Sequence, residues 1–227
     1  GLGRPLAAAL LLTGPLFPCL LDDLFVTPVL WSGVLIALSL AAHGTGRTRW
    51  SVFLGVAALF MRELALPYCV LGAGLAWWEG RRREALAWSL GIALWIAYFG
   101  LHAWNVAQHI PPDAIAHRRG WIRLGGAAFV LSTAQMNAWL LLLPHVLTAA
   151  YFSAAMFGLA GWNTPFGRRV ALTASLYVAA FGVAGQDFNQ YWGCIVAPLY
   201  CFGAARLRGS LGDLWRACAF AAVRSPA

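Results

Sequence analysis

The sequence predicts an all-α fold: a multi-pass transmembrane bundle with about eight helical membrane segments, some short or broken, plus an outer interfacial helix. Hydrophobic residues make up 61% of the 227 residues and charged residues only 11%, whereas a soluble domain has about 25% charged residues. Apolar stretches also alternate with short polar turns along the whole chain, and no polar stretch is long enough for a separate soluble domain. Residues 1–227 are therefore expected to form a single transmembrane domain.

The apolar stretches define the expected elements in chain order. Several are shorter than the ~20 residues that a helix needs to cross the hydrocarbon core, which favours broken or recessed helices. Residues Leu211–Val223 are expected to form either an interfacial helix or a disordered end. Because the sequence enters an apolar stretch at once, without a signal-peptide cleavage site, we expect a fragment of a longer membrane protein. The stretches are Pro5–Leu21, Leu24–Ala42, Trp50–Met61, Leu64–Trp78, Ala85–Val106, Asn137–Gly161, Val170–Ala184 and Cys194–Ala205.

Short arginine-rich connections predict the orientation of the bundle. The net charge of +8 comes entirely from arginine, since the chain contains no lysine. The positive-inside rule assigns these connections to the cytoplasm, and the basic balance is therefore attributed to topology, with no nucleic-acid partner. The four connections are Gly44–Arg49, Glu79–Glu84, Asn163–Arg169 and Arg206–Gly209.

The opposite turns then face outward. One crossing, Asn137–Gly161, must join the outer loop to Arg168 and Arg169, and Gly125–Gln135 would lie along the outer surface as an interfacial helix. The outward turns are Asp22–Asp23, Arg62–Glu63, Ala107–Leu124 and Gly185–Gly193.

Arg62 and Glu63 interrupt an uncharged stretch of membrane length, Trp50–Trp78. A charge within the bilayer costs about 2.5–3.5 kcal/mol on insertion scales, so such residues usually face a cavity, a partner or a substrate. We expect a hairpin with this pair at a recessed outward tip, and Pro67 fits a break near the top of the second arm. The alternative is one continuous crossing with the pair near the middle of the bilayer.

The outward turns carry candidate site residues that the inward turns lack. Asp22 and Asp23 follow the first apolar stretch, and Arg118 and Arg119 lie in the outer loop with several histidines. Each group also has a structural interpretation: a solvated helix end, an ion pair that fixes packing, a polar turn with a tryptophan anchor, or contacts with lipid headgroups. The last outward turn supplies Asp187, Asn189, Gln190, Tyr191 and Trp192.

Neither the histidines nor the cysteines predict a metal centre. His102, His109 and His117 have no spacing typical of a ligand set, and the five cysteines are scattered in apolar stretches without a C-x-x-C pair. No cofactor is predicted, and a divalent metal is not indicated by the sequence.

Two stretches resemble GT-C-type membrane glycosyltransferases. The first is GVAALFMRELALPYCVL followed by WWEGRRREALAW, in which an R-E-x-A-L-P type element follows a short helix and precedes a basic turn. The second, GQDFNQYWGCIVAPLYCFGAARL, is similar to the last outward turn and crossing of such proteins. The resemblance spans roughly Leu6 to Leu207, and its motifs recur in the family without being a catalytic signature.

The resemblance implies transfer of a sugar from a polyprenyl-phosphate carrier to an unknown acceptor, on the outer face of a bacterial inner membrane, in cell-surface glycan or glycolipid synthesis. It implies an acid as general base, for which Asp22, Asp23 and Glu63 are the candidates. Arg62, and more weakly Arg118 and Arg119, would bind the lipid phosphate, and the polar residues of the last outward turn would bind sugar. The family's usual catalytic acid should lie upstream of Gly1, so we do not expect the fragment to be active alone.

Two other classes of function fit the same composition. One is a transporter or flippase for a lipid-linked or anionic solute, which internal symmetry would favour. The other is a non-catalytic membrane assembly subunit.

Overall fold

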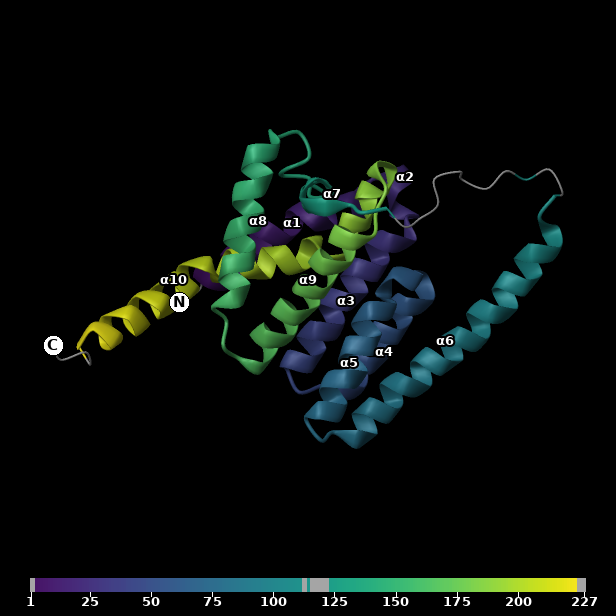
Figure 1. Cartoon of the computed structure of the whole chain (residues 1–227), viewed down its shortest axis with the longest axis horizontal. Coiled ribbons are helices and arrows are strands. Elements are labelled where there is room, and N and C mark those ends of the chain that lie inside the picture. Colours follow the sequence, from purple (N-terminus) through teal and green to yellow (C-terminus); the bar gives the residue numbers. More distant parts are fainter. Residues whose placement is uncertain (1–2, 112–113, 115–122, 224–227) are drawn as a thin grey trace.

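The computed structural model describes residues 3–111, 114 and 123–223, with the side chains of residues 3–5, 22–23 and 220–223 left out. The described residues form helices joined by turns, without a strand (Figure 1). The all-α prediction is therefore confirmed. The elements are α1 (Gly3–Leu16), η1 (Phe17–Leu20), α2 (Asp22–Phe25), α3 (Pro28–Gly44), α4 (Thr48–Met61), η2 (Glu63–Ala65), α5 (Leu66–Trp78), α6 (Arg82–His109), α7 (Gly126–Ala134), α8 (His145–Ala160), α9 (Pro165–Val183), η3 (Asp187–Ile195) and α10 (Ala197–Val223).

Within the described part of the chain, only α6 is long and apolar enough to cross a membrane by itself, at 28 residues. Four other apolar helices are shorter: Leu6–Leu20, Pro28–Gly44, Thr48–Met61 and His145–Ala160. Eight membrane segments are therefore not supported.

Two predicted boundaries are also wrong. The crossing expected from Asn137 starts only at His145, where α8 begins, because residues 137–143 form turns. The connection expected at Arg206–Gly209 lies inside α10, which continues as a helix to Val223. The C-terminal segment is thus helical as far as it is described.

The stretch around Arg62 folds back as a hairpin, as the sequence predicts. The Cys69 thiol donates a hydrogen bond to the carbonyl oxygen of Gly55 at 3.3 Å. In one continuous helix these two residues would lie about 21 Å apart along the axis. Arg62 takes an extended conformation (φ −155°, ψ 129°) between α4 and η2, and Pro67 occupies the first turn of α5.

Trp88 of α6 anchors this hairpin. Its ring is fully buried and meets Tyr68 edge-on, with 5.7 Å between the ring centroids. A Cβ atom on Gly72 would lie only 2.9 Å from the indole, so glycine at this position lets α5 approach α6 closely. Beyond Trp95 every residue of α6 up to His109 is exposed, and Figure 1 shows this half of the helix leaning away from α4 and α5.

Three of the predicted arginine-rich connections meet at one end of the bundle, here called the arginine end (residues 43–49, 79–84 and 163–169). Arg169 of α9 lies 3.4 Å from Glu79 and 3.9 Å from Glu84, while Arg81 pairs with Glu79 and lies 2.5 Å from Glu84. His43, in the last turn of α3, lies 3.9 Å from Glu84. The side chains of Arg169 and Glu84 are each 8% exposed. This network holds three turns, far apart in sequence, on the same side.

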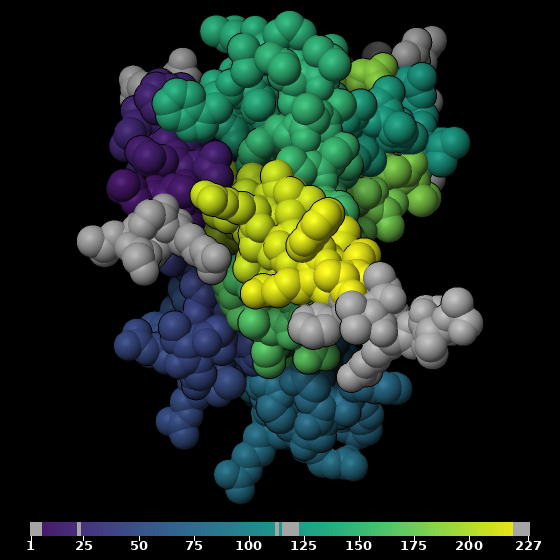
Figure 2. All heavy atoms as spheres, turned by 90° about the vertical axis from the view of Figure 1, so that its left-hand side faces the viewer, coloured from purple at the N-terminus to yellow at the C-terminus, as the bar shows by residue number. Residues whose placement is uncertain are grey.

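The C-terminal helix α10 packs against α8 through small residues. The Ser210 hydroxyl donates a hydrogen bond to the carbonyl oxygen of Gly158 at 2.7 Å. Gly158 and Gly203 bring the two backbones together, since a Cβ atom on either glycine would meet the other helix. Figure 2 shows α10 (yellow) in front of the molecule, with the N-terminal helix (purple) beside it, and both α8 and α1 contact α10.

Candidate functional site

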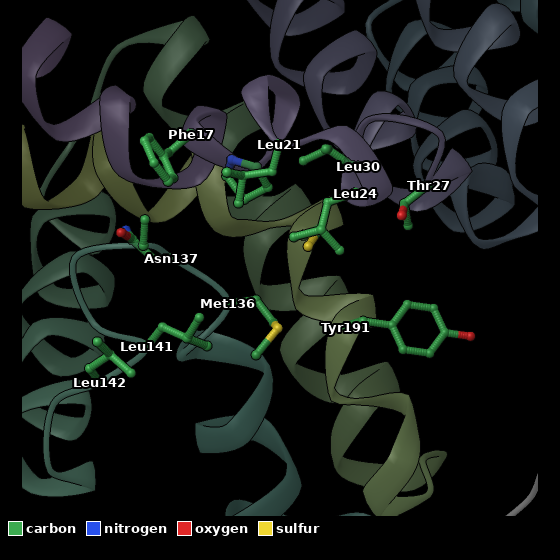
Figure 3. A pocket seen from close by; sticks show the side chains of 13 residues that line it. Phe17, Leu21, Leu24, Thr27, Leu30, Met136, Asn137, Leu141, Leu142 and Tyr191 are labelled. Atoms are coloured by element: carbon green, nitrogen blue, oxygen red, sulfur yellow. The ribbon is translucent and has the colours of Figure 1, made fainter.

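An apolar cavity of about 330 Å³ lies at the end of the bundle opposite the arginine end (Figure 3). It lies between η1 and α2 on one side and the α7–α8 connection and η3 on the other, with the first turn of α3 completing the wall. Its size falls in the usual range for small-molecule pockets. The lining residues are Phe17, Pro18, Leu21, Leu24, Thr27, Leu30, Met136, Asn137, Ala138, Leu141, Leu142, Tyr191 and Cys194.

Few polar groups interrupt this apolar lining. Asn137 is 4% exposed, and its side-chain oxygen accepts a hydrogen bond from the backbone N–H of Trp139 at 3.0 Å. The backbone N–H of Ala138 donates to the carbonyl oxygen of Gly14 at 3.1 Å, which ties the α7–α8 connection to α1. The wall is thus held by the backbone, and its surface suits a hydrocarbon chain.

The two candidate acids of the first outward turn are adjacent in sequence to residues that line this cavity. Asp22 and Asp23 begin α2, and their neighbours Leu21 and Leu24 both line the cavity. The side chains of the two aspartates lie outside the described part of the structure.

The polar turn predicted at Gly185–Gly193 becomes η3, and its residues have different surroundings. Tyr191 lines the cavity, whereas the Asp187 carboxylate is 90% exposed and lies 3.5 Å from the Arg123 guanidinium. The backbone N–H of Gly185 donates to the carbonyl oxygen of Arg123 at 3.1 Å. Gln190 is exposed to solvent.

Trp192 and Asn189 are buried. The Trp192 ring is 8% exposed and packs edge-on against Phe129 and tilted against Phe181, with 6.2 Å between centroids in each case. It therefore has no free face on which a sugar could stack. Asn189 is fully buried, and neither side-chain amide atom has a hydrogen-bond partner among the described residues.

Arg62 and Glu63 form an ion pair at the hairpin tip, with 3.3 Å between Arg62 Nε and Glu63 Oε1. Their side chains are 28% and 47% exposed. The tip is recessed: the Tyr177 hydroxyl of α9 donates to the carbonyl oxygen of Leu64 at 2.7 Å, and α9 continues six residues beyond Tyr177 to Val183, a rise of about 9 Å.

The structure brings α2 and η3 together around the cavity, but it does not place Arg62 or Glu63 in the cavity wall. Between the hairpin tip and η3 lie the rings of Tyr177 and Phe181, 5.8 Å apart between centroids. Arg118 and Arg119 lie outside the described residues.

Sequence reasoning missed the α7–α8 connection as part of the site. Met136, Asn137 and Leu141 line the cavity but lie in or beside a stretch expected to cross the membrane. The only sequence signal was a polar residue, Asn137, at the start of that stretch.

Comparisons with protein-family models, with curated proteins and with solved structures found no match. Among the described residues, no group of three or more His, Cys, Asp or Glu side chains could hold a metal ion.

Proposed function

We propose that this chain belongs to a multi-pass bacterial inner-membrane glycosyltransferase of the GT-C type, which uses a polyprenyl-phosphate-linked sugar as donor. The observation that carries the proposal is the apolar cavity beside α2 and η3. A polyprenyl-phosphate sugar has a hydrocarbon chain and a polar head, and the cavity pairs an apolar wall with neighbouring acidic and amide residues.

The reaction assigns a distinct task to each end of this ligand. The isoprenoid chain lies in the cavity, where Leu24, Leu30 and Leu141 remove it from water. An acceptor hydroxyl attacks the anomeric carbon, the bond from that carbon to the phosphate oxygen breaks, and the hydroxyl proton passes to a carboxylate. Asp22 or Asp23 is the proposed acceptor of this proton, because α2 forms part of the cavity wall.

The leaving phosphate needs cationic ligands, and arginine binds phosphate oxygens through two parallel hydrogen bonds. Arg62 of the hairpin tip is the proposed ligand, with Glu63 orienting it; because the tip does not line the cavity, the proposal requires the phosphate to lie outside the cavity. Asp187, Gln190 and Tyr191 of η3 are the proposed sugar contacts. Trp192 and Asn189 are left out of this set, because their side chains are buried.

The first test measures binding of farnesyl phosphate, a short polyprenyl phosphate, to the purified chain in detergent micelles. The double variant Leu24→Gln/Leu141→Gln makes the cavity wall polar, and both leucines are about half exposed, so the fold should tolerate the change. We expect an affinity loss of about tenfold from the lost apolar contacts. The matched control is Leu90→Gln/Leu94→Gln on α6, where the exposure is similar. Equal affinity in both double variants would contradict the cavity assignment.

The second test separates the phosphate role of Arg62 from a structural one. Arg62→Gln should weaken farnesyl phosphate binding while leaving farnesol binding unchanged, because only the first ligand carries the anion. Equal losses for both ligands would assign Arg62 to structure alone. In cells, the same variants should lower the surface glycan or carbohydrate-bearing lipid that the protein makes.

A further inference from the structure

The arginine end carries cationic side chains that the ion network does not neutralise. Arg81 and Arg169 balance Glu79 and Glu84 within the network. Arg47, Arg49, Arg82, Arg83 and Arg168 are exposed there, and no described carboxylate lies within ion-pair distance of any of them. This end therefore presents an excess of positive charge.

Exposed tryptophans lie among these arginines. Trp50 is 59% exposed, Trp77 64% and Trp78 87%. The Arg82 guanidinium lies 4.9 Å from the centroid of the Trp77 ring. Arginine and tryptophan side by side are typical of the level at which lipid headgroups meet the hydrocarbon region.

A groove between α3 and α4 reaches this end. Its volume is about 430 Å³, and its walls are the apolar side chains of Leu38, Ala41, Ala42 and Leu54, with Trp50, Thr45 and Arg47 at the polar end. The Thr45 hydroxyl is used by the backbone, since it donates to the carbonyl oxygens of Ala41 and Ala42. Arg47 is therefore the charged group that faces a ligand in the groove.

We propose that this groove binds an anionic phospholipid, with one acyl chain between α3 and α4 and the headgroup phosphate on Arg47. An amphiphile with an apolar tail and a negative head matches a groove that is apolar along the helices and cationic at their ends. A soluble anion would leave the apolar walls uncovered, and a neutral lipid would leave the arginines without a counter-charge. The site is distinct from the cavity in Figure 3, which lies at the opposite end, so it does not depend on the proposed glycosyltransferase activity.

The test compares ligands on the purified chain in uncharged detergent micelles, with bound lipid measured by native mass spectrometry. Phosphatidylglycerol should bind about fivefold or more tightly than phosphatidylcholine with the same acyl chains, because each arginine near an anionic lipid contributes a factor of this order. Arg47→Gln should lower the ratio of the phosphatidylglycerol affinity to the phosphatidylcholine affinity by about fivefold. The matched control, Arg208→Gln, removes an exposed arginine on α10 and should leave the preference unchanged.

A second pair of variants tests the groove itself. Ala41→Phe fills the groove and should weaken both phospholipids, whereas Ala93→Phe on the exposed face of α6 should weaken neither. The melting temperature without lipid checks that each variant is folded. Equal binding of the two phospholipids, equal preference in Arg47→Gln and Arg208→Gln, or displacement of phosphatidylglycerol by millimolar inorganic phosphate would each overturn the proposal.

Discussion

Replacing Arg169 by leucine tests the ion network at the arginine end. Arg169 lies between Glu79 and Glu84, and its side chain is only 8% exposed. Removing one partner of a buried ion pair costs 3–5 kcal/mol when the other charge is left without compensation. Here Glu84 keeps Arg81 at 2.5 Å, and Glu79 is 43% exposed and can be hydrated. We therefore expect a smaller loss of about 2 kcal/mol of unfolding free energy.

The neighbouring residue provides a matched control for this variant. Arg168 is exposed, and no described carboxylate pairs with it. Arg168→Leu should therefore change stability by less than about 0.5 kcal/mol. In thermal unfolding followed by tryptophan fluorescence in mild detergent, Arg169→Leu should lower Tm by about 4–8 °C. Adding Glu84→Gln to Arg169→Leu should recover part of the lost stability, because Arg81 then has to balance one carboxylate and not two.

An equal Tm for Arg168→Leu and Arg169→Leu would contradict this expectation. It would mean that the network at the arginine end is hydrated in solution and contributes no more than a surface ion pair.

Three further predictions follow from buried groups. Burial lowers the pKa of His43 to about 4 from its usual 6.5, aided by the positive charges of Arg169 and Arg81 and opposed by Glu79. As the pH falls, His43 is protonated in the unfolded chain before it is protonated in the folded chain, so stability should fall as the pH drops from about 6.5 toward 4. His43→Gln should flatten a plot of Tm against pH in this range, and an unchanged slope would contradict the assignment. Asn189→Leu removes a buried amide without a described partner and should raise Tm, since an unsatisfied polar group costs about 1–3 kcal/mol; a lower Tm would indicate that the amide has a bound partner in solution. Gly72→Leu should destabilise the α5–α6 contact by about 1–3 kcal/mol because its side chain would displace the Trp88 indole. At Gly74 on the same helix an added Cβ atom meets no atom within 4 Å, so Gly74→Leu should be tolerated.

The features that the sequence predicts well are local ones. The helical character follows from long apolar stretches, and the hairpin at Arg62 follows from a charge pair and a proline within a few residues. The grouping of three arginine-rich turns also follows from a local pattern, because each turn carries its own charges. The fourth, at Arg206–Gly209, failed because α10 continues through it, and its helical geometry depends on contacts such as that of Ser210 with Gly158.

The candidate site was predicted less well, because burial decides what a polar side chain can do. Trp192 and Tyr191 are neighbours in the chain, yet one is buried among Phe129 and Phe181 and the other lines the cavity. Both residues lie in η3, a nine-residue 3-10 helix in which neighbouring side chains point in different directions. No pattern in the sequence predicted that helix.

Adjacent residues were enough to predict the helical class and the accumulation of arginine in short turns, because these features depend on local hydropathy and charge. They favoured a hairpin at Arg62 and Glu63 over one continuous crossing, and the contact of Cys69 with Gly55 decided between the two. The folded structure was needed to show that α2, η3 and the α7–α8 connection enclose one apolar cavity, that Arg169 joins Glu79 and Glu84, and that a groove ends at Arg47. These features depend on contacts between residues far apart in the chain, and their geometry is set by how closely glycines and small side chains let the helices approach.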